Sequence, residues 1–334
     1  MSTLTAVICA YTENRWCDLC EAVSSLDSQT VKPDQVILVI DKNPDLLERA
    51  RRTFLDCEVI DNQEQKGLAG ARNTGIAHAK GDVVAFLDDD ARAQPQWLEC
   101  LVAPYASPSI QGTGGVARPD WATGQPSWFP VEFLWVVGCS YRGLPVTVAP
   151  IRNPIGAGMS FRRSVFDELG GFDTTMGRVA SAPLGCEETV LGIRVVQRHG
   201  EGSIVQVPSA VIDHRVGTER ATISYFVRRC FAEGISKAAV AQRVGASDGS
   251  SAERRYVSRV LPSGVLAGTK RAARGELAGL ARAGLIVVGL AVTTIGYGIG
   301  RMGLSGFLTR MLVRDAQSGD TRDGSGRGTT KQGS

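Results

Sequence analysis

The sequence has few histidines and little net charge. Its 334 residues include 3 histidines, and 37 basic against 34 acidic residues leave a formal charge of +3. Proteins that bind nucleic acid normally carry a strong basic excess, so the overall charge gives no support for that class. With 43% hydrophobic and 21% charged residues, the composition is that of an ordinary globular protein rather than a disordered one.

Paired cysteine motifs are also missing. Cys17 and Cys20 form a single C-x-x-C without a second pair, and the other cysteines are scattered, several of them within apolar runs. A structural zinc site needs four ligands, so we do not expect one here. We expect instead that the cysteines are reduced, partly buried thiols in a cytosolic compartment. A strand-like run begins within a few residues of the start, and we therefore expect no secretory signal.

The segment 4–90 alternates between two kinds of pattern. Short apolar runs typical of buried strands alternate with stretches in which apolar residues recur at helical spacing; in chain order these are 4–11, 15–29, 34–41, 45–54, 57–61, 68–80 and 82–90. This alternation predicts an α/β fold with a parallel sheet covered on both faces. Ligands of such sheets bind beyond the carboxyl ends of the strands, and polar residues follow three of the strands there: Thr12 with Glu13, Asp41, and Asp88–Asp90.

The rest of the chain is patterned differently. Residues 112–165 are dense in glycine, proline and tryptophan, and we expect an irregular segment there. An amphipathic helix is predicted over 221–243, with its arginines and Lys237 away from the apolar side. A basic connection with glycine and serine follows over 244–282.

The acidic triplet Asp88–Asp90 directly follows the apolar run VVAFL. Repulsion among three adjacent carboxylates is unfavourable unless something positive lies among them. Hard oxygen ligands of this kind suit Mg²⁺ or Mn²⁺, which usually bind a few carboxylates together with substrate phosphates. A solvated turn or a helix N-terminus, where acids are common, is the alternative. The triplet alone does not decide between the two.

The residues around the triplet carry a recognisable succession of motifs. Residues 66–91, KGLAGARNTGIAHAKGDVVAFLDDDA, resemble the central signature of family 2 glycosyltransferases with the GT-A fold: a G-x-x-x-A-R-N-x-G helix, a Gly-Asp pair, an apolar strand and an Asp-x-Asp. Ala91 stands where the family often has a further Asp. The resemblance covers about residues 4–240 and implies a Rossmann-like, mostly parallel sheet with helices on both faces.

The family resemblance implies a nucleotide-sugar donor, which we expect to be UDP-linked, bound with Mg²⁺ or Mn²⁺. It implies metal binding by Asp90 first, with Asp88 nearer the nucleotide ribose, while the role of Asp89 stays open. His214, in VIDHRV after an apolar strand, would complete the metal shell or touch the diphosphate, although a lone histidine is more often structural. The implied donor-nucleotide residues are Ala10, Thr12, Glu13, Asp41, Gly67, Arg72, Asp88 and Asp89.

A second stretch, residues 170–200, resembles the family's G-G-F-D … E-D-x-D-L-x-x-R segment. Glu187 and Glu188 fall where the family has Glu-Asp, and Val190 replaces an acid. The resemblance implies that a carboxylate here takes the proton of the acceptor hydroxyl, which needs such help because an alcohol is a poor nucleophile at neutral pH. We assign this role to Glu188 first and to Glu187 second. The alternative is a pair of acids that merely stabilise a helix N-terminus.

Two segments are candidates for contacts to sugars. Residues 151–163 resemble the family segment that closes over the donor sugar, with bends at Asn153 and Gly156. The aromatic residues of the irregular segment could form the acceptor site, because flat apolar rings stack on sugars and lipid chains, or they could form a lid packed on the core. These residues are Trp121, Trp128, Phe129 and Trp135.

The segment 283–300 carries no charge over 18 residues, which is the lower limit for a membrane-spanning helix. A single span, a shallow interfacial helix and a buried core helix all remain open. We favour membrane association, at the cytoplasmic face of the cell membrane, as a peripheral or single-span protein. A lipid-linked sugar or a growing cell-surface glycan would then be the acceptor.

These patterns predict three parts of the chain. The first is a GT-A domain over 1–243, with a donor half at 1–95 and an acceptor half at 96–243. A helical region, which we expect to be membrane-associated, follows over 244–314, and the polar, Gly-rich tail 315–334 should be disordered.

The sequence therefore predicts an inverting glycosyltransferase. A nucleotidyltransferase that makes nucleotide sugars usually needs a Gly-rich loop after the first strand, and AYTENRWCD contains no glycine. A phosphatase with an Asp-x-Asp-x-Thr turn is disfavoured because Arg92 stands at the position of the threonine. A non-catalytic sugar-binding protein of the same fold is disfavoured, though not excluded, by Glu187 and Glu188.

Overall fold

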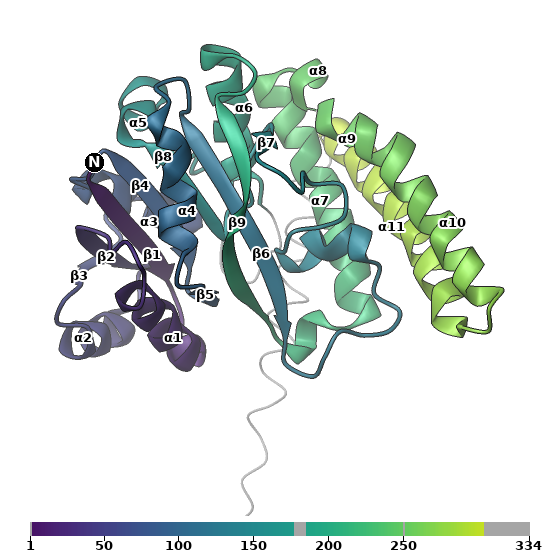
Figure 1. Cartoon of the computed structure of the whole chain (residues 1–334), viewed down its shortest axis with the longest axis horizontal. Helices are drawn as coiled ribbons and strands as arrows, with labels where there is room; N and C mark the ends of the chain where they lie inside the picture. Colours follow the sequence, from purple (N-terminus) through teal and green to yellow (C-terminus); the bar gives the residue numbers. More distant parts are fainter. Residues whose placement is uncertain (1, 177–184, 250, 304–334) are drawn as a thin grey trace, which may run out of the picture.

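The computed structural model describes residues 2–176, 185–249 and 251–303 (Figure 1). The predicted tail 315–334 lies outside these residues, and so does 177–184, which is part of the stretch 170–200 that resembles the second family motif. One curved sheet of nine strands runs through the molecule in the order β3-β2-β1-β4-β8-β6-β9-β5, and β7 pairs with β9. The α/β class predicted from the sequence is confirmed.

The first half of the sheet is parallel, as predicted. β1, β2, β3 and β4 pair in parallel and alternate with the predicted helices. The elements of this half are β1 (Leu4–Ala10), η1 (Glu13–Arg15), α1 (Trp16–Asp27), β2 (Gln35–Ile40), α2 (Pro44–Thr53), β3 (Glu58–Asp61), α3 (Leu68–His78) and β4 (Val83–Asp88).

Both faces of this sheet are covered, which explains why its strands are continuous apolar runs. Side chains alternate along each strand, so that Val7 and Phe86 join one apolar cluster whereas Ile8 and Leu87 join another on the opposite face. Helices α3, α5 and α6 contribute to the cluster of Val7 and Phe86. Helices α1, α2 and α4 contribute to the cluster of Ile8 and Leu87. The strands are therefore fixed in register, and their carboxyl ends form one edge.

The second half of the sheet is mixed. β8 runs antiparallel to both β4 and β6, while β9 is parallel to β6 and antiparallel to β5 and β7. The elements are β5 (Ala91–Ala93), α4 (Trp97–Val102), η2 (Ala103–Ala106), β6 (Gly112–Trp121), η3 (Val131–Val137), β7 (Ala149–Pro150), β8 (Gly158–Arg162), α5 (Arg163–Leu169), α6 (Glu187–His199), β9 (Ile204–Val216), η4 (Thr218–Arg220) and α7 (Ile223–Val244).

The expectation of an irregular segment at 112–165 is wrong at its start, because β6 is a ten-residue strand in the middle of the sheet. The strand was not predicted because its glycines are typical of loops. Close packing requires glycine at these positions. A Cβ atom at Gly115 would lie 2.5 Å from the carbonyl oxygen of Ala210, and one at Gly112 would lie 2.7 Å from the ring of Phe161. A second correction concerns His214, which lies inside β9 rather than after it.

The C-terminal part is helical, including most of the expected connection over 244–282. Its elements are α8 (Ala246–Gly249), α9 (Ser251–Arg255), the π-helix η5 (Tyr256–Val260), α10 (Leu261–Ala272) and α11 (Leu277–Arg301). α10 and α11 form a hairpin beside α7, on the side of the molecule away from β3 (Figure 1). Among the described residues, α11 is the one helix long and apolar enough to cross a membrane.

The predicted helix over 221–243 is confirmed as α7, but the placement of its charges is not. Arg229 is buried, and the side chains of Glu233 and Lys237 are 12% and 20% exposed. The three pair with one another inside the protein: Arg229 Nη1 lies 2.9 Å from Glu233 Oε2, and Lys237 Nζ lies 3.6 Å from Glu233 Oε1. These three charges therefore face the domain, whereas Arg228 and Arg243 are exposed.

Candidate active site

The carboxyl ends of β1, β2 and β4 bring Thr12, Asp41 and Asp88 to one edge of the sheet, as the sequence predicts (Figure 1). β4 ends at Asp88, and Asp89 and Asp90 form the turn into β5. β5 pairs with β9 so that Ala91 lies opposite His214. This pairing carries the histidine of the second half of the chain to the acidic triplet of the first.

Asp90 is surrounded by positive groups. Arg15 Nη1 lies 3.0 Å and Arg220 Nη2 lies 3.2 Å from its Oδ2, and His214 Nε2 lies 3.2 Å from its Oδ1. Burial alone would raise the pKa of Asp90, but His214, Arg15 and Arg220 outweigh it and hold that pKa well below its usual range. Burial likewise opposes the charge of His214, yet the Asp90 carboxylate raises the pKa of this histidine to about 10. Asp90 is thus a permanent anion.

Asp89 has a different environment although it is the next residue. Its Oδ1 lies 2.9 Å from Arg15 Nη1, while its buried Oδ2 has no hydrogen-bond partner among the described residues. Burial, together with the neighbouring charge of Asp90, raises the pKa of Asp89 to about 7 against the opposing effect of Arg15. The triplet therefore combines carboxylates of unequal acidity.

Arg72 links the acidic triplet to the glutamate pair. It is 2% exposed, and its guanidinium carbon lies 5.9 Å and 5.4 Å from the ring centres of Phe86 and Phe172. Nη2 lies 3.1 Å from Asp88 Oδ1, and Nη1 lies 2.9 Å from Glu187 Oε1. A planar guanidinium with several donors can bridge two carboxylates in this way. The two acidic motifs, about a hundred residues apart in the chain, thus share one cation.

Asp88, Asp90 and His214 could hold a metal ion, because one potential ligand atom from each lies within 4.8 Å of the others. Two carboxylate oxygens and an imidazole nitrogen form a suitable partial shell for a divalent cation that takes its other ligands from water and a diphosphate. The donor set therefore fits Mg²⁺ or Mn²⁺. The imidazole would have to be unprotonated to bind the ion, so the metal would replace the contact of His214 with Asp90.

Glu187 and Glu188 occupy the first turn of α6. Glu187 is 3% exposed and pairs with Arg72, and its Oε2 has no hydrogen-bond partner among the described residues. Burial, and next the charge of Glu187, raises the pKa of Glu188 to about 7, although Arg72 acts in the opposite direction. A carboxylate with this pKa can exchange a proton near neutral pH.

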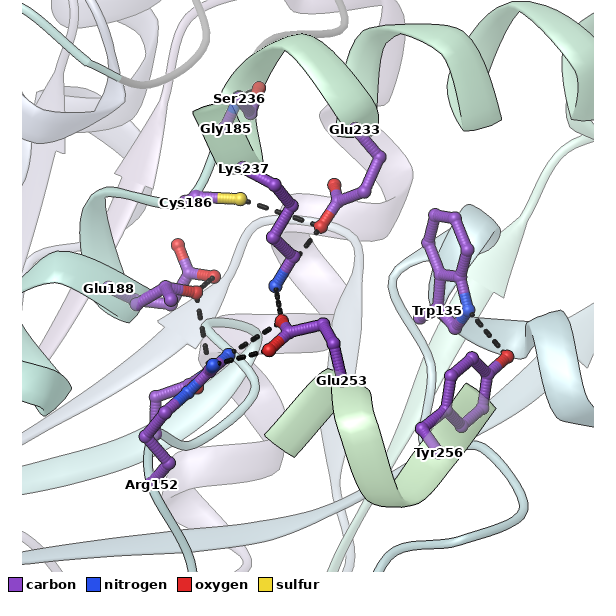
Figure 2. A network of polar contacts seen from close by, with 12 residues as sticks. Trp135, Arg152, Gly185, Cys186, Glu188, Glu233, Ser236, Lys237, Glu253 and Tyr256 are labelled. Carbon is purple, nitrogen blue, oxygen red and sulfur yellow. Dashed lines mark hydrogen bonds and ion pairs between the residues drawn. The ribbon is translucent and has the colours of Figure 1, made fainter. Parts of the chain in front are cut away.

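A chain of hydrogen bonds leads from Glu188 to Arg152 (Figure 2). Thr189 Oγ1 donates to Glu188 Oε1 at 3.2 Å and accepts from Asn153 Nδ2 at 3.3 Å. Arg152 Nε donates to Asn153 Oδ1 at 2.9 Å. Because arginine only donates, the atom of Asn153 that faces Arg152 must be the amide oxygen, and the NH₂ group then faces Thr189. The Thr189 hydroxyl accepts from this NH₂ group, so its single proton is donated to Glu188. The donor order along the whole chain is therefore set by one cation.

The far end of this chain is anchored by ion pairs. Arg152 contacts the Glu253 carboxylate with both terminal nitrogens, at 2.6 Å and 2.9 Å. Lys237 Nζ lies 2.7 Å from Glu253 Oε1 (Figure 2). Because Lys237 belongs to α7 and Glu253 to α9, these contacts join the glutamate site to the C-terminal helices.

The remaining residues predicted to bind the nucleotide lie at the β1 and β2 end of the edge. Asp41 accepts hydrogen bonds from Asn62 Nδ2 at 2.6 Å and from the backbone N–H of Gly67 at 2.9 Å. Thr12 caps η1 by accepting from the N–H of Asn14 at 3.2 Å. Glu13 is exposed, and Ala10 is the buried last residue of β1.

The residues predicted to contact sugars divide into two groups. Asn153 and Gly156 lie at the site: Asn153 belongs to the chain that ends at Glu188, and the carbonyl oxygen of Gly156 accepts from Arg72 Nη2 at 3.0 Å. Trp128 and Trp135 are half-buried in an apolar cluster with Phe129, which is fully buried. Contact of Trp128 and Trp135 with an acceptor stays a prediction.

Two comparisons of sequence place the chain in a family. The sequence model of glycosyl transferase family 2 matches residues 5–170. A relative, glucosyl-dolichyl phosphate glucuronosyltransferase from Haloferax volcanii, is 35% identical over 238 residues, which are 70% of this chain and 76% of the relative. The chain belongs to glycosyl transferase family 2. It is a glycosyltransferase, and the resemblance found in its motifs is confirmed.

More distant matches agree with this membership. Polypeptide N-acetylgalactosaminyltransferase 6 from Bos taurus is 28% identical to the glycosyltransferase over 240 residues, 63% of this chain but 37% of that protein. A solved mannosyltransferase from Pyrobaculum calidifontis, in complex with GDP-Man and Mn²⁺, is similar in fold with a TM-score of 0.55. That match has 18% identity and covers 88% of this chain and 87% of the other, so the GT-A fold extends over most of the glycosyltransferase.

Four residues around the site were not singled out in the sequence. Arg15 and Arg220 pair with Asp90, while Thr189 and Arg152 belong to the chain at Glu188. Arg15 could have been found, because it follows the first strand in AYTENR and three carboxylates require compensation. Arg220, far along the chain in an ordinary polar turn, gives no such signal.

Proposed function

We propose that this glycosyltransferase moves a sugar from a nucleotide-diphosphate donor, most simply a UDP-sugar, to a hydroxyl group of an acceptor, with inversion at the anomeric carbon. The observation that carries the proposal is the meeting of two chemically different carboxylate groups at one sheet edge. Asp88 and Asp90 form one group with His214, and Glu188, with a pKa of about 7, follows Glu187 in the other. Arg72 connects the two groups.

In this proposal Asp90, Asp88 and His214 hold a divalent cation. When bound, Mg²⁺ or Mn²⁺ would neutralise the charge on the departing diphosphate. The nucleotide lies over the ends of β1 and β2, against Ala10, Thr12, Glu13, Asp41 and Gly67. This role requires a fixed position for Asp88, and the bridging contact of Arg72 provides it.

Glu188 is the base. The acceptor oxygen attacks the anomeric carbon as the bond from that carbon to the diphosphate oxygen breaks, and the acceptor proton passes to the Glu188 carboxylate. Thr189 donates to Glu188 Oε1 and so keeps that carboxylate oriented. Attack from the face opposite the diphosphate inverts the configuration. Glu187 is the weaker candidate because its Oε1 is already engaged by Arg72 in a buried pair.

We further propose that the acceptor is linked to a lipid and that the enzyme works at the cytoplasmic face of the membrane. The relative from Haloferax volcanii bears a name that specifies a glucosyl-dolichyl phosphate. α11 of the present chain is apolar enough to meet a membrane. Trp128 and Trp135 then lie on the lipid side of the acceptor, in the apolar cluster that also contains residues of α11.

Calorimetry with UDP and Mn²⁺ tests the assignment of the two carboxylate groups. Asp90→Ala should weaken Mn²⁺-dependent UDP binding by about a hundredfold or more, because a direct ligand is lost. Glu188→Ala should leave that binding unchanged and abolish sugar transfer. Asp45→Ala, on the exposed side of α2, is the matched control for removal of a carboxylate.

The outcome of these titrations is decisive for the ligand assignment. Unchanged Mn²⁺-dependent affinity in Asp90→Ala would reject it. Screening UDP-, GDP- and dTDP-sugars for thermal stabilisation in the presence of Mn²⁺ would identify the donor. Formation of a nucleotide sugar and pyrophosphate from a nucleoside triphosphate and a sugar 1-phosphate would instead favour a nucleotidyltransferase.

A further inference from the structure

Helix α11 packs against its neighbours through glycine. A Cβ atom at Gly296 would lie 2.3 Å from the carbonyl oxygen of Phe231 in α7, and one at Gly289 would lie 2.5 Å from the ring of Phe133. The hairpin contact with α10 is equally close, since a Cβ atom at Gly268 would lie 2.6 Å from the carbonyl oxygen of Gly279. Apart from Ile286, the buried residues of α11 are therefore glycines and one alanine, and such small residues let helix backbones approach each other.

The outward face of α11 carries its large apolar side chains. Leu277, Leu280, Val287 and Ile295 are 80%, 60%, 57% and 57% exposed, and Val288 is 41% exposed. Their spacing places them on one stripe along the helix, which has no charged residue from Leu277 to Ile295 except Arg282 on another face. A helix on the surface of a water-soluble protein shows the reverse arrangement, with large apolar residues inside and polar residues outside.

Basic residues border this apolar stripe. From 254 to 301 the sequence contains eight lysines and arginines and a single acid, Glu276. Three of the basic residues, Lys270, Arg271 and Arg274, are exposed at the end of α10 and in the turn that leads to Leu277. An apolar stripe with a basic border is complementary to the surface of a bilayer that contains anionic lipids.

The packing of α11 determines how it can meet such a bilayer. A spanning helix is surrounded by lipid around most of its circumference, but α11 lies along α7 (Figure 1). α7 in turn carries Arg229, Glu233 and Lys237 toward the interior of the catalytic domain. If α11 crossed the membrane, α7 and these charges would enter the hydrocarbon layer, which is strongly unfavourable. The remaining arrangement has the hairpin lying flat.

We propose that α10 and α11 dock in the plane of an anionic bilayer surface, with the stripe Leu277–Ile295 in the boundary between headgroups and acyl chains and without crossing the membrane. This inference rests on the proposed membrane-linked function and specifies its partner and geometry. α9 joins the hairpin to the site through Glu253, which holds Arg152 and Lys237. Docking of the hairpin therefore fixes the orientation of Glu188 relative to the bilayer.

Flotation of the purified full-length protein with lipid vesicles tests the proposal. The wild type should float with vesicles of phosphatidylcholine and phosphatidylglycerol, and much less with phosphatidylcholine alone. Val287→Asp with Ile295→Asp should abolish flotation. Replacing Lys270, Arg271 and Arg274 by alanine should weaken binding to the anionic vesicles on the order of a hundredfold, since each basic residue near such a surface contributes about 1 kcal/mol.

Leu55→Asp is the matched control, because Leu55 is 81% exposed and lies between α2 and β3, away from the hairpin. It should float like the wild type. All the substituted side chains of the stripe are exposed, so each variant should keep the melting temperature of the wild type, which circular dichroism checks. UDP binding with Mn²⁺, measured on the same samples, reports separately on the proposed function.

Three results would overturn the docking proposal. The first is a wild type that floats with neither kind of vesicle. The second is a wild type that alkaline carbonate fails to release from cell membranes, because this would indicate a spanning helix. The third is a wild-type dimer that dissociates in Val287→Asp with Ile295→Asp while vesicles are not bound, because the stripe would then contact a second copy.

Discussion

Asp90, which is buried, and Glu188, which is half-buried, are carboxylates at the same edge of the sheet, but their surroundings differ. Asp90 has Arg15, Arg220 and His214 within 3.2 Å, and its pKa is held well below the usual range. Glu188 accepts a hydrogen bond from the neutral hydroxyl of Thr189, and burial raises the pKa of Glu188 to about 7. One group is a permanent anion, suited to hold a cation, whereas the other can gain and lose a proton near neutral pH.

Arg72 is the residue that belongs to both regions, and removing it should have the largest effect. Arg72→Ala leaves Asp88 and Glu187 without their shared cation in a buried position, so we expect the free energy of unfolding to fall by about 3–5 kcal/mol. Arg72→Lys should recover part of this loss, because an ammonium group keeps the charge but cannot bridge both carboxylates with planar geometry. Urea denaturation measures both variants.

The control for this prediction is Arg52→Ala on the surface of α2. Arg52 is 77% exposed and pairs with Glu48 one helical turn away, and such pairs contribute only about 0.3–0.5 kcal/mol. Equal losses in Arg72→Ala and Arg52→Ala would show that the bridge does not join the two regions energetically.

The comparison also shows what could be predicted from the sequence. The donor half was predictable because each strand from β1 to β4 is a continuous apolar run that ends in polar residues, so that local pattern and sheet topology agree. The position of Asp88 and Asp90 at the sheet edge followed from that topology alone. The need for a positive group among the aspartates followed from simple electrostatics.

The two arginines among those positive groups did not follow from the sequence, whereas the family resemblance indicated His214. Arg220 reaches Asp90 from a turn 130 residues away, and His214 is brought there by the pairing of β5 with β9. β6 was missed because its glycines, required by close contacts such as that of Gly115 with Ala210, resemble a loop pattern. Long-range pairing of this kind leaves no periodic signal in either partner segment.

The raised pKa of Glu188 gives a second prediction, on stability. Its pKa in the folded protein is about 7 against an ordinary value of 4.5, so between these values the folded protein binds more protons than the unfolded chain. The contribution of Glu188 to stability therefore falls as the pH rises through this window. Glu188→Gln should be more stable than the wild type by about 1–3 kcal/mol well above pH 7, and the difference should vanish well below pH 4.5.

Denaturant titrations of the wild type and of Glu188→Gln at a series of pH values measure this difference. Glu48→Gln, an exposed glutamate on α2, is the control and should show no such pH dependence. A constant difference between Glu188→Gln and the wild type at every pH would contradict the environment described for Glu188.

The smallest expected effect concerns Thr189, whose hydroxyl distinguishes the surroundings of Glu188 from those of Asp90. Thr189→Val keeps the shape of a buried side chain but removes the hydrogen bond to Glu188 Oε1, so kcat/KM for sugar transfer should fall about tenfold. The hydrogen bond from Thr189 stabilises the ionised form of Glu188, so its loss should raise the pKa of Glu188. The rising limb of the pH profile should therefore move to higher pH. Thr189→Ser, which retains the hydroxyl, should restore both rate and profile, while UDP affinity stays the same in all three proteins. If valine and serine variants share one pH profile, Thr189 contributes only packing, and the orientation of the base depends on other contacts.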